Sequence, residues 1–165
     1  MRYSNIDTFE IVNGTNVGVS LYTQGCNRHC EGCFNSQAWD LDGGELYTIE
    51  ARDKIIEACC RPGIKRFSIV GGEPLLDRNK DELISLCSLV KEANPDIKIW
   101  VYTGDIYENV KNEWNDLLEP FVDVLVDGPF ILEQRDITLP FKGSSNQRLI
   151  DIKKTLDRGE IVIYE

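Results

Sequence analysis

The sequence has no long hydrophobic run and few basic residues, and both shortages restrict the possible functions. No segment approaches the roughly 18 consecutive apolar residues of a membrane span, so we expect none. Residues 1–7 contain no apolar segment of the secretory type, so we expect a cytoplasmic protein. The chain has 28 acidic residues but only 18 lysines and arginines, which are scattered, and its net charge is -10. Nucleic-acid binding requires a basic face, so we expect no nucleic-acid partner.

Histidine is nearly absent, whereas cysteine occurs six times. Three of these residues, Cys26, Cys30 and Cys33, form the pattern C-x3-C-x2-C. In a reducing compartment, clustered cysteines are more often metal ligands than disulfides. A closed zinc site needs four protein ligands, and the single histidine, His29, is poorly placed to bind the same metal as both neighbouring cysteines. The triplet therefore favours a 4Fe-4S cluster held by three thiolates, with one iron left for another ligand.

Apolar segments alternate between strand and helix patterns along most of the chain. Short β-branched or aromatic runs predict buried strands at 17–22, 67–70, 97–102 and 122–126. Helices are predicted at 49–60, from 77 or 79 to 93, and through Ile106, Val110 and Leu117. This alternation predicts an α/β fold with a parallel sheet and right-handed crossovers. We find no repeat or linker and expect a single domain over residues 1–165.

The two ends of the chain are less regular than its centre. Residues 1–16 are predicted to be a short lead-in before the first strand, with an extended segment at 9–12. Residues 141–148 are predicted to form a polar loop. A short helix from Asp151 and a final strand at 161–163 are expected to close the chain. The central strands are therefore the expected framework of any site.

Each central strand is followed by small or polar residues. These groups are Gln24-Gly25-Cys26, Gly71-Gly72-Glu73, Tyr102-Thr103-Gly104 and Asp127-Gly128. Because the carboxyl ends of parallel strands meet at one edge, we expect a common site there. Glycines at 71 and 72 would let the backbone approach a ligand closely. Thr103 and Asp127 would either cap the next helix or turn, or face the ligand.

The cysteine triplet followed by Gly71-Gly72-Glu73-Pro74 resembles the radical S-adenosylmethionine superfamily. This resemblance implies an incomplete parallel (β/α) barrel, with the cluster loop at 25–34 and S-adenosylmethionine bound to the open iron through its amino and carboxylate groups. The cofactor contacts implied are Gly32, Cys33, Phe34, Gly71, Gly72, Glu73, Thr103 and Asp127. Gly32 replaces an aromatic residue that packs on adenine in many members, and Phe34 follows the third cysteine instead. No catalytic residue is implied beyond the cluster ligands.

Within that superfamily, Gly32-Cys33-Phe34-Asn35, Trp39 and the segment 141–148 resemble the family that activates anaerobic ribonucleoside-triphosphate reductase. The resemblance implies an oxidoreductase of anaerobic ribonucleotide reduction, with an electron donor such as flavodoxin. The reduced cluster would cleave S-adenosylmethionine. The resulting 5′-deoxyadenosyl radical would remove a hydrogen atom from a glycine of the reductase, leaving a glycyl radical. The substrate would then be a protein loop.

Two other functions fit part of the same pattern. A radical S-adenosylmethionine enzyme similar to a deazapurine synthase would act on a small molecule in a closed pocket. A non-catalytic electron-transfer protein would need a fourth protein ligand for its cluster. Cys59, Cys60 and Cys87 fall on predicted helices, and we expect them in the core. The planar guanidinium of Arg148 suits a carboxylate, either of the cofactor or of the partner.

Overall fold

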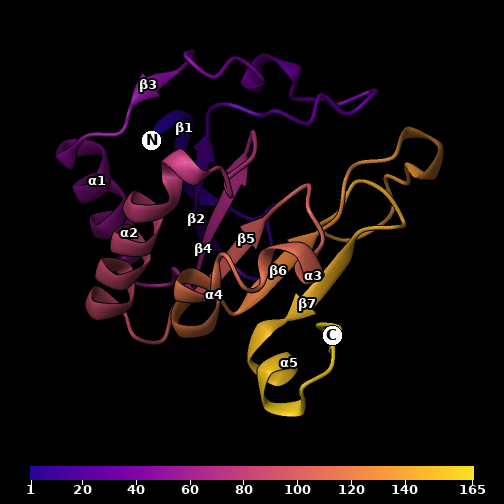
Figure 1. Cartoon of the computed structure of the whole chain (residues 1–165). Coiled ribbons are helices and arrows are strands. Elements are labelled where there is room, and N and C mark those ends of the chain that lie inside the picture. The colour runs from indigo at the N-terminus through magenta and orange to yellow at the C-terminus, as the bar shows by residue number, and fades with distance from the viewer.

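One mixed β-sheet runs through the chain and sets the motif-bearing strand ends beside one another. The computed structural model describes residues 1–165, and its seven strands pair in the order β3-β1-β2-β4-β5-β6-β7 (Figure 1). The strands are β1 (Arg2–Glu10), β2 (Gly18–Thr23), β3 (Glu45–Leu46), β4 (Arg66–Gly71), β5 (Lys98–Tyr102), β6 (Val124–Asp127) and β7 (Arg148–Asp151). The central strands β2, β4, β5 and β6 are parallel, as the alternation of strands and helices predicted.

Both edges of the sheet are antiparallel, which differs from the parallel sheet predicted. β1 pairs with β2, and β7 pairs with β6, in antiparallel register. The lead-in prediction for residues 1–16 is wrong, because β1 is a nine-residue strand in which only Ile6 and Glu10 are buried. The loop prediction for 141–148 fails at Arg148, which begins β7. The predicted final strand is reduced to a single bridge between Ile150 and Ile163.

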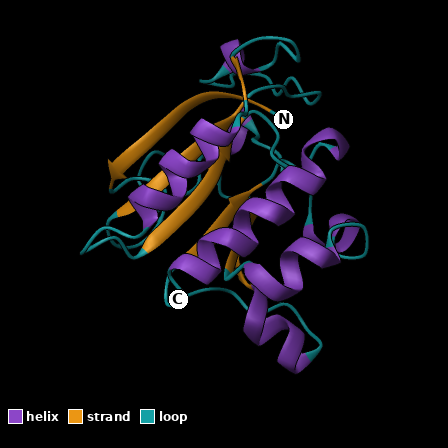
Figure 2. Ribbon diagram, turned by 90° about the vertical axis from the view of Figure 1, so that its left-hand side faces the viewer, coloured by secondary structure: helices purple, strands orange, loops and turns teal.

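The helices connect the strands and lie mainly on one side of them (Figure 2). They are α1 (Ile49–Cys59), α2 (Lys80–Ala93), α3 (Tyr107–Val110), α4 (Asn115–Phe121) and α5 (Ile152–Arg158). Three short 3-10 helices are η1 (Ser36–Ala38), η2 (Asp77–Asn79) and η3 (Leu132–Gln134). None of the helices combines the length and apolar character needed to cross a membrane.

Local sequence signals explain where several helices begin. The hydroxyl of Thr48 caps α1 by accepting a hydrogen bond from the Ala51 amide at 3.3 Å, as predicted. Asp151 caps α5 in the same way through the Lys154 amide at 3.0 Å. The helix predicted through 106–117 is instead two short helices, α3 and α4, and Ile106 lies before the first of them.

The apolar core lies between the helices and the sheet. Alternate side chains of the central strands point toward the helices, as the two-residue period of a strand requires. The core includes Leu21, Phe67, Ile69, Ile99, Val101 and Leu125 from strands and Ile55, Leu83, Leu86, Val90 and Leu117 from helices. Cys59 and Cys87 are buried there as predicted, whereas Cys60 is exposed because it caps the end of α1.

A buried ion pair lies on the other face of the sheet. Arg66 on β4 pairs with Glu10 on β1, and their side chains are 1% and 5% exposed. Ser20 donates a second hydrogen bond to the Glu10 carboxylate at 2.7 Å. Because a buried charge is costly without a partner, this pair links the antiparallel edge to the parallel centre of the sheet.

Candidate functional site

A cavity of about 780 Å³ opens at the carboxyl ends of the central strands. Most of the residues selected from the sequence line it. They are Cys26, Cys30, Cys33, Phe34, Gly71, Gly72, Glu73 and Thr103. Gly32 and Asp127 are the two selected residues outside this wall. The predicted convergence of strand ends is therefore present for the turns after β2, β4, β5 and β6, the last of which contributes Gly128.

The cysteine loop follows β2 and is held most firmly at its start. The Gly25 amide donates to the Ala38 carbonyl at 2.9 Å, and the Cys26 amide donates to the Trp39 carbonyl at 3.3 Å. Further along, the Cys33 amide donates to the Cys30 carbonyl at 3.1 Å, which makes a local turn. The first cysteine is thus tied to a distant segment, whereas the second and third are tied to each other.

The donor set fits an iron–sulfur cluster. All three cysteines of the loop are free and partly exposed, and soft thiolates suit such clusters. Burial raises the pKa of the Cys26 thiol, and the hydrogen bonds that this thiol makes with the backbone of Arg28 and His29 oppose that shift. No three Cys, His, Asp or Glu side chains converge as a finished metal site.

The glycine turn after β4 touches the cysteine loop directly. The Glu73 amide donates to the Gly25 carbonyl at 2.8 Å, and the Gly72 amide donates to the Thr23 carbonyl at 2.9 Å. A Cβ on Gly72 would lie 2.3 Å from the Gly25 carbonyl oxygen, so no side chain fits at this position. The two motifs separated in the sequence therefore form one backbone unit in the fold.

Glu73 is buried and its carboxylate is fully paired. The residue is 2% exposed. Its Oε1 accepts hydrogen bonds from the Leu75 amide at 3.0 Å and the Thr103 hydroxyl at 2.9 Å. Its Oε2 accepts from the Gly104 amide at 2.8 Å and from Arg28 Nε at 2.9 Å. Glu73 therefore joins the loops that follow β2, β4 and β5.

Arg28 belongs to this network although the sequence analysis did not select it. In addition to Glu73, its Nη2 donates to Asp105 Oδ2 at 2.7 Å. Its position between Cys26 and Cys30 is the only sequence signal that could have identified it. The neighbouring His29 stacks on Trp39 with ring centroids 4.6 Å apart, so its ring packs against the loop.

Asp127 and Arg148 form a separate network beside the cavity. Asp127 accepts hydrogen bonds from the Tyr107 amide at 2.7 Å and from Arg148 Nε at 3.0 Å. It therefore binds the first amide of α3, which precedes β6, and not the helix or turn that follows Asp127, as was predicted. Arg148 also donates to both Glu108 oxygens, at 3.0 and 2.7 Å. These bonds lower the pKa of Glu108 to about 2. Arg148 thus binds carboxylates of its own chain.

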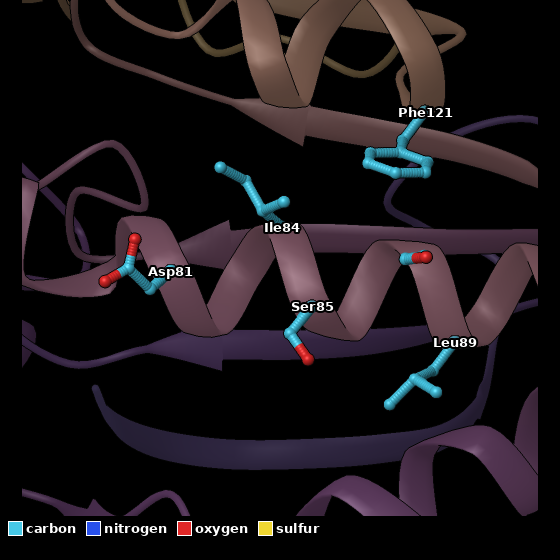
Figure 3. Close-up of a pocket in the computed structure, with 6 residues that line it drawn as sticks. Asp81, Ile84, Ser85, Leu89 and Phe121 are labelled. Carbon is cyan, nitrogen blue, oxygen red and sulfur yellow. The ribbon is translucent and has the colours of Figure 1, made fainter.

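A smaller hollow of about 380 Å³ lies on α2, away from these motifs (Figure 3). Its lining residues are Asp81, Ile84, Ser85, Ser88, Leu89 and Phe121. It contains no cysteine, no histidine and none of the residues selected from the sequence. The cavity at the strand ends is therefore the candidate site.

The fold and this site define an α/β protein of the iron–sulfur class. The family described as a 4Fe-4S single cluster domain matches residues 12–150. Among curated relatives, the anaerobic ribonucleoside-triphosphate reductase-activating protein of Vibrio cholerae is 39% identical over 149 residues, covering 89% of this chain and 96% of the relative. The protein of that name from Enterobacteria phage T4 is 34% identical, over 90% of this chain and 93% of the relative. The one from Escherichia coli K12 is 32% identical, over 89% of this chain and 96% of the relative. The chain belongs to the family of anaerobic ribonucleoside-triphosphate reductase-activating proteins, and the resemblance found in the sequence is confirmed.

Proposed function

We propose that this protein activates anaerobic ribonucleoside-triphosphate reductase by radical S-adenosylmethionine chemistry. The observation that carries the proposal is the contact between the cysteine loop and the Gly71-Gly72-Glu73 turn in one cavity. Cys26, Cys30 and Cys33 would hold three irons of a 4Fe-4S cluster and leave the fourth to S-adenosylmethionine. The curated relatives carry the name of the reductase that they activate, which supports the choice of protein substrate.

When bound, a reduced cluster and S-adenosylmethionine would supply a 5′-deoxyadenosyl radical able to take a hydrogen atom from a glycine of the reductase. The residues of this chain place and shield that chemistry. Gly71 and Gly72 line the cavity and would lie along the methionine end. A Cβ on either would meet backbone atoms at the end of β2 or in the cysteine loop, so glycine lets these segments pack closely. Phe34 lies at the cavity wall with 95% of its surface exposed, where its ring is available to adenine.

The remaining predicted contacts act at different distances from the cofactor. Thr103 lines the cavity and also orients Glu73 through its hydroxyl. Gly32 has a φ of +72° and packs against Leu132, so it shapes the turn between the second and third cysteines. Asp127 lies behind the wall and holds the end of β6 against α3. We assign Asp127 a positioning role.

We further propose that the sheet is a shortened, incomplete (β/α) barrel and that residues 1–165 act as one domain. Its parallel strands β2, β4, β5 and β6 would form the barrel wall. The large cavity would admit a glycine-bearing loop of the reductase. The protein would work in the cytoplasm and receive its electron from a small donor such as flavodoxin.

Anaerobic reconstitution with iron and sulfide, followed by dithionite and S-adenosylmethionine, tests the chemistry. We expect 5′-deoxyadenosine from the intact protein and none from Cys26→Ala. Addition of the reductase should then produce a doublet radical signal in electron paramagnetic resonance. Failure to form the nucleoside would overturn the radical mechanism. Formation of the nucleoside without a radical on the reductase would overturn the activase assignment and favour a small-molecule substrate.

A further inference from the structure

Arg28 has a guanidinium nitrogen that no group of the chain uses. Its Nε donates to Glu73 and its Nη2 donates to Asp105, but its Nη1 makes no hydrogen bond within the chain. The side chain is 29% exposed and lines the same cavity as the three cysteines. Arg28 therefore presents unpaired donors beside the expected cluster.

The position of Arg28 is enforced by its surroundings. Two carboxylates hold its planar head, and its stem crosses the turn after β5 at Gly104. A Cβ on Gly104 would lie 2.4 Å from Arg28 Cδ, so the path of the side chain depends on glycine at this position. An arginine held in this way loses little further conformational freedom when it binds a ligand.

The charges around the cavity favour a ligand with a carboxylate near Arg28. The wall contains two cationic side chains, Arg28 and Lys142, and one acidic side chain, Glu73, whose two oxygens are engaged. Lys142 donates to the Gln147 carbonyl at 2.7 Å. Arg148, the carboxylate-binding residue expected from the sequence, is paired with two acids of its own chain. Arg28 is therefore the arginine with open donors next to the cysteines.

We propose that Arg28 binds the carboxylate of the methionine moiety of S-adenosylmethionine through Nη1. This inference rests on the proposed function, in which the amino and carboxylate groups of that moiety bind the open iron. The carboxylate must then lie close to the cysteine loop, where Arg28 is placed. Glu73 becomes a positioning residue, because its buried carboxylate orients Arg28 and Thr103.

Ligand binding to the cluster-loaded protein, without reductant, tests this assignment. Equilibrium dialysis would compare S-adenosylmethionine with its decarboxylated analogue, which keeps the sulfonium, adenosine and amine. We expect Arg28→Ala to weaken S-adenosylmethionine binding by about tenfold to a hundredfold, which is the loss of affinity usually caused by removal of a charged hydrogen bond. Binding of the analogue should change by less than about twofold, because it lacks the group that Arg28 recognises. An equal loss for both ligands, or no loss, would overturn the proposal.

Two controls separate recognition from general support of the loop. Arg78 donates to the Gln24 carbonyl at 3.0 Å and so supports the start of the loop from outside the cavity wall. Neither Arg78→Ala nor Lys142→Ala should change the ratio of the two affinities. A selective loss of S-adenosylmethionine binding in Lys142→Ala would assign the carboxylate to Lys142 instead.

A second variant guards against failure of the first to load iron. Arg28→Gln keeps a polar side chain near Glu73 but removes the positive charge. Like Arg28→Ala, it should weaken the binding of S-adenosylmethionine but not that of the decarboxylated analogue. Iron content is measured on every variant, and affinities are compared at matched loading. If the intact, loaded protein binds no S-adenosylmethionine, the proposed function itself fails. If it binds but both Arg28 variants keep the discrimination, only the assignment of Arg28 fails.

Discussion

The backbone amide of Glu73 donates a 2.8 Å hydrogen bond to the carbonyl oxygen of Gly25, the residue before the first cysteine of the triplet. This bond joins the turn after β4 to the loop after β2 without any side chain between them. A displacement of the turn must therefore move the start of the cysteine loop. The glycines of the turn therefore support the cysteine loop through the backbone.

Gly72→Ala should disrupt the start of the cysteine loop. The new Cβ would lie 2.3 Å from the Gly25 carbonyl oxygen, and backbone atoms cannot give way as a flexible side chain can. We expect a loss of about 1–3 kcal/mol in the free energy of unfolding, measured in urea, and reduced iron per chain after reconstitution. Gly63→Ala is the control away from the site: its φ of +88° makes alanine strained, but no atom lies within 4 Å, so this variant should lose stability without losing iron. Equal iron loading in the two variants would contradict this prediction.

Replacing any one of Cys26, Cys30 or Cys33 by alanine should abolish loading of an intact cluster, because a thiolate ligand is lost. The visible absorbance and iron content after anaerobic reconstitution measure this effect. Cys87→Ala is the control, since its thiol is buried in the core and makes no contact with the site. It should cost about 1 kcal/mol of stability, roughly the value of one buried methylene, and load iron normally. Normal loading by all three triplet variants would refute the assignment of ligands.

Removal of one partner from the Arg66–Glu10 pair should destabilise the fold strongly. Arg66→Met leaves the Glu10 carboxylate buried without its cation, so we expect a loss of about 3–5 kcal/mol in the free energy of unfolding. The double change Glu10→Gln with Arg66→Met removes both charges and should recover part of this loss. Urea denaturation of the single and double variants measures the coupling. Strictly additive losses would show that the two side chains act independently.

The contact between Arg148 and Glu108 predicts a stability difference that depends on pH. Arg148 lowers the pKa of Glu108 to about 2, below its ordinary value of 4.5. An acid whose pKa is lower in the folded state stabilises that state at pH values above the unfolded pKa of 4.5. This contribution is lost as the pH falls from 4.5 toward 2. We expect Glu108→Gln to lower stability at pH 6 by less than about 1 kcal/mol, because the carboxylate is largely exposed.

At about pH 3 the difference between Glu108→Gln and the unchanged protein should be smaller, since the carboxyl group is becoming protonated. Urea denaturation at both pH values measures it. Glu165→Gln, at an exposed acid for which the structure gives no ion pair, is the control and should show no such trend. A difference that grows as pH falls would reverse the predicted sign.

The central strands were predictable because their residues are buried on both faces. In β4, for example, Phe67, Ile69 and Val70 are buried together with the small residue Ser68 between them. The edge strands lack this signal. β1 has only two buried residues and mixes polar residues such as Asn5 and Asp7 with few apolar ones, so its strand character depends on pairing with β2.

The same distinction applies to the site. The cysteine triplet and the glycine turn could be recognised because their residues lie close together in the sequence at fixed spacings, and the structure brings the two motifs together. Arg28 has no such pattern, because its role depends on Glu73 and Asp105, which are distant in sequence. For Phe34, the sequence shows its position after Cys33, but it does not predict that 95% of the residue is exposed. Long-range pairing, rather than composition, determines these features.

Cluster assembly would start from one ligand that the fold already holds. The backbone of Cys26 is tied to Trp39, whereas Cys30 and Cys33 are tied only to each other. Ordering a residue costs roughly 1–2 kcal/mol of conformational entropy. That cost would fall mainly on residues 30–33, because side-chain contacts already hold Arg28 and His29. Cluster assembly would then require only the second half of the cysteine loop to move toward Cys26, while the sheet stays unchanged.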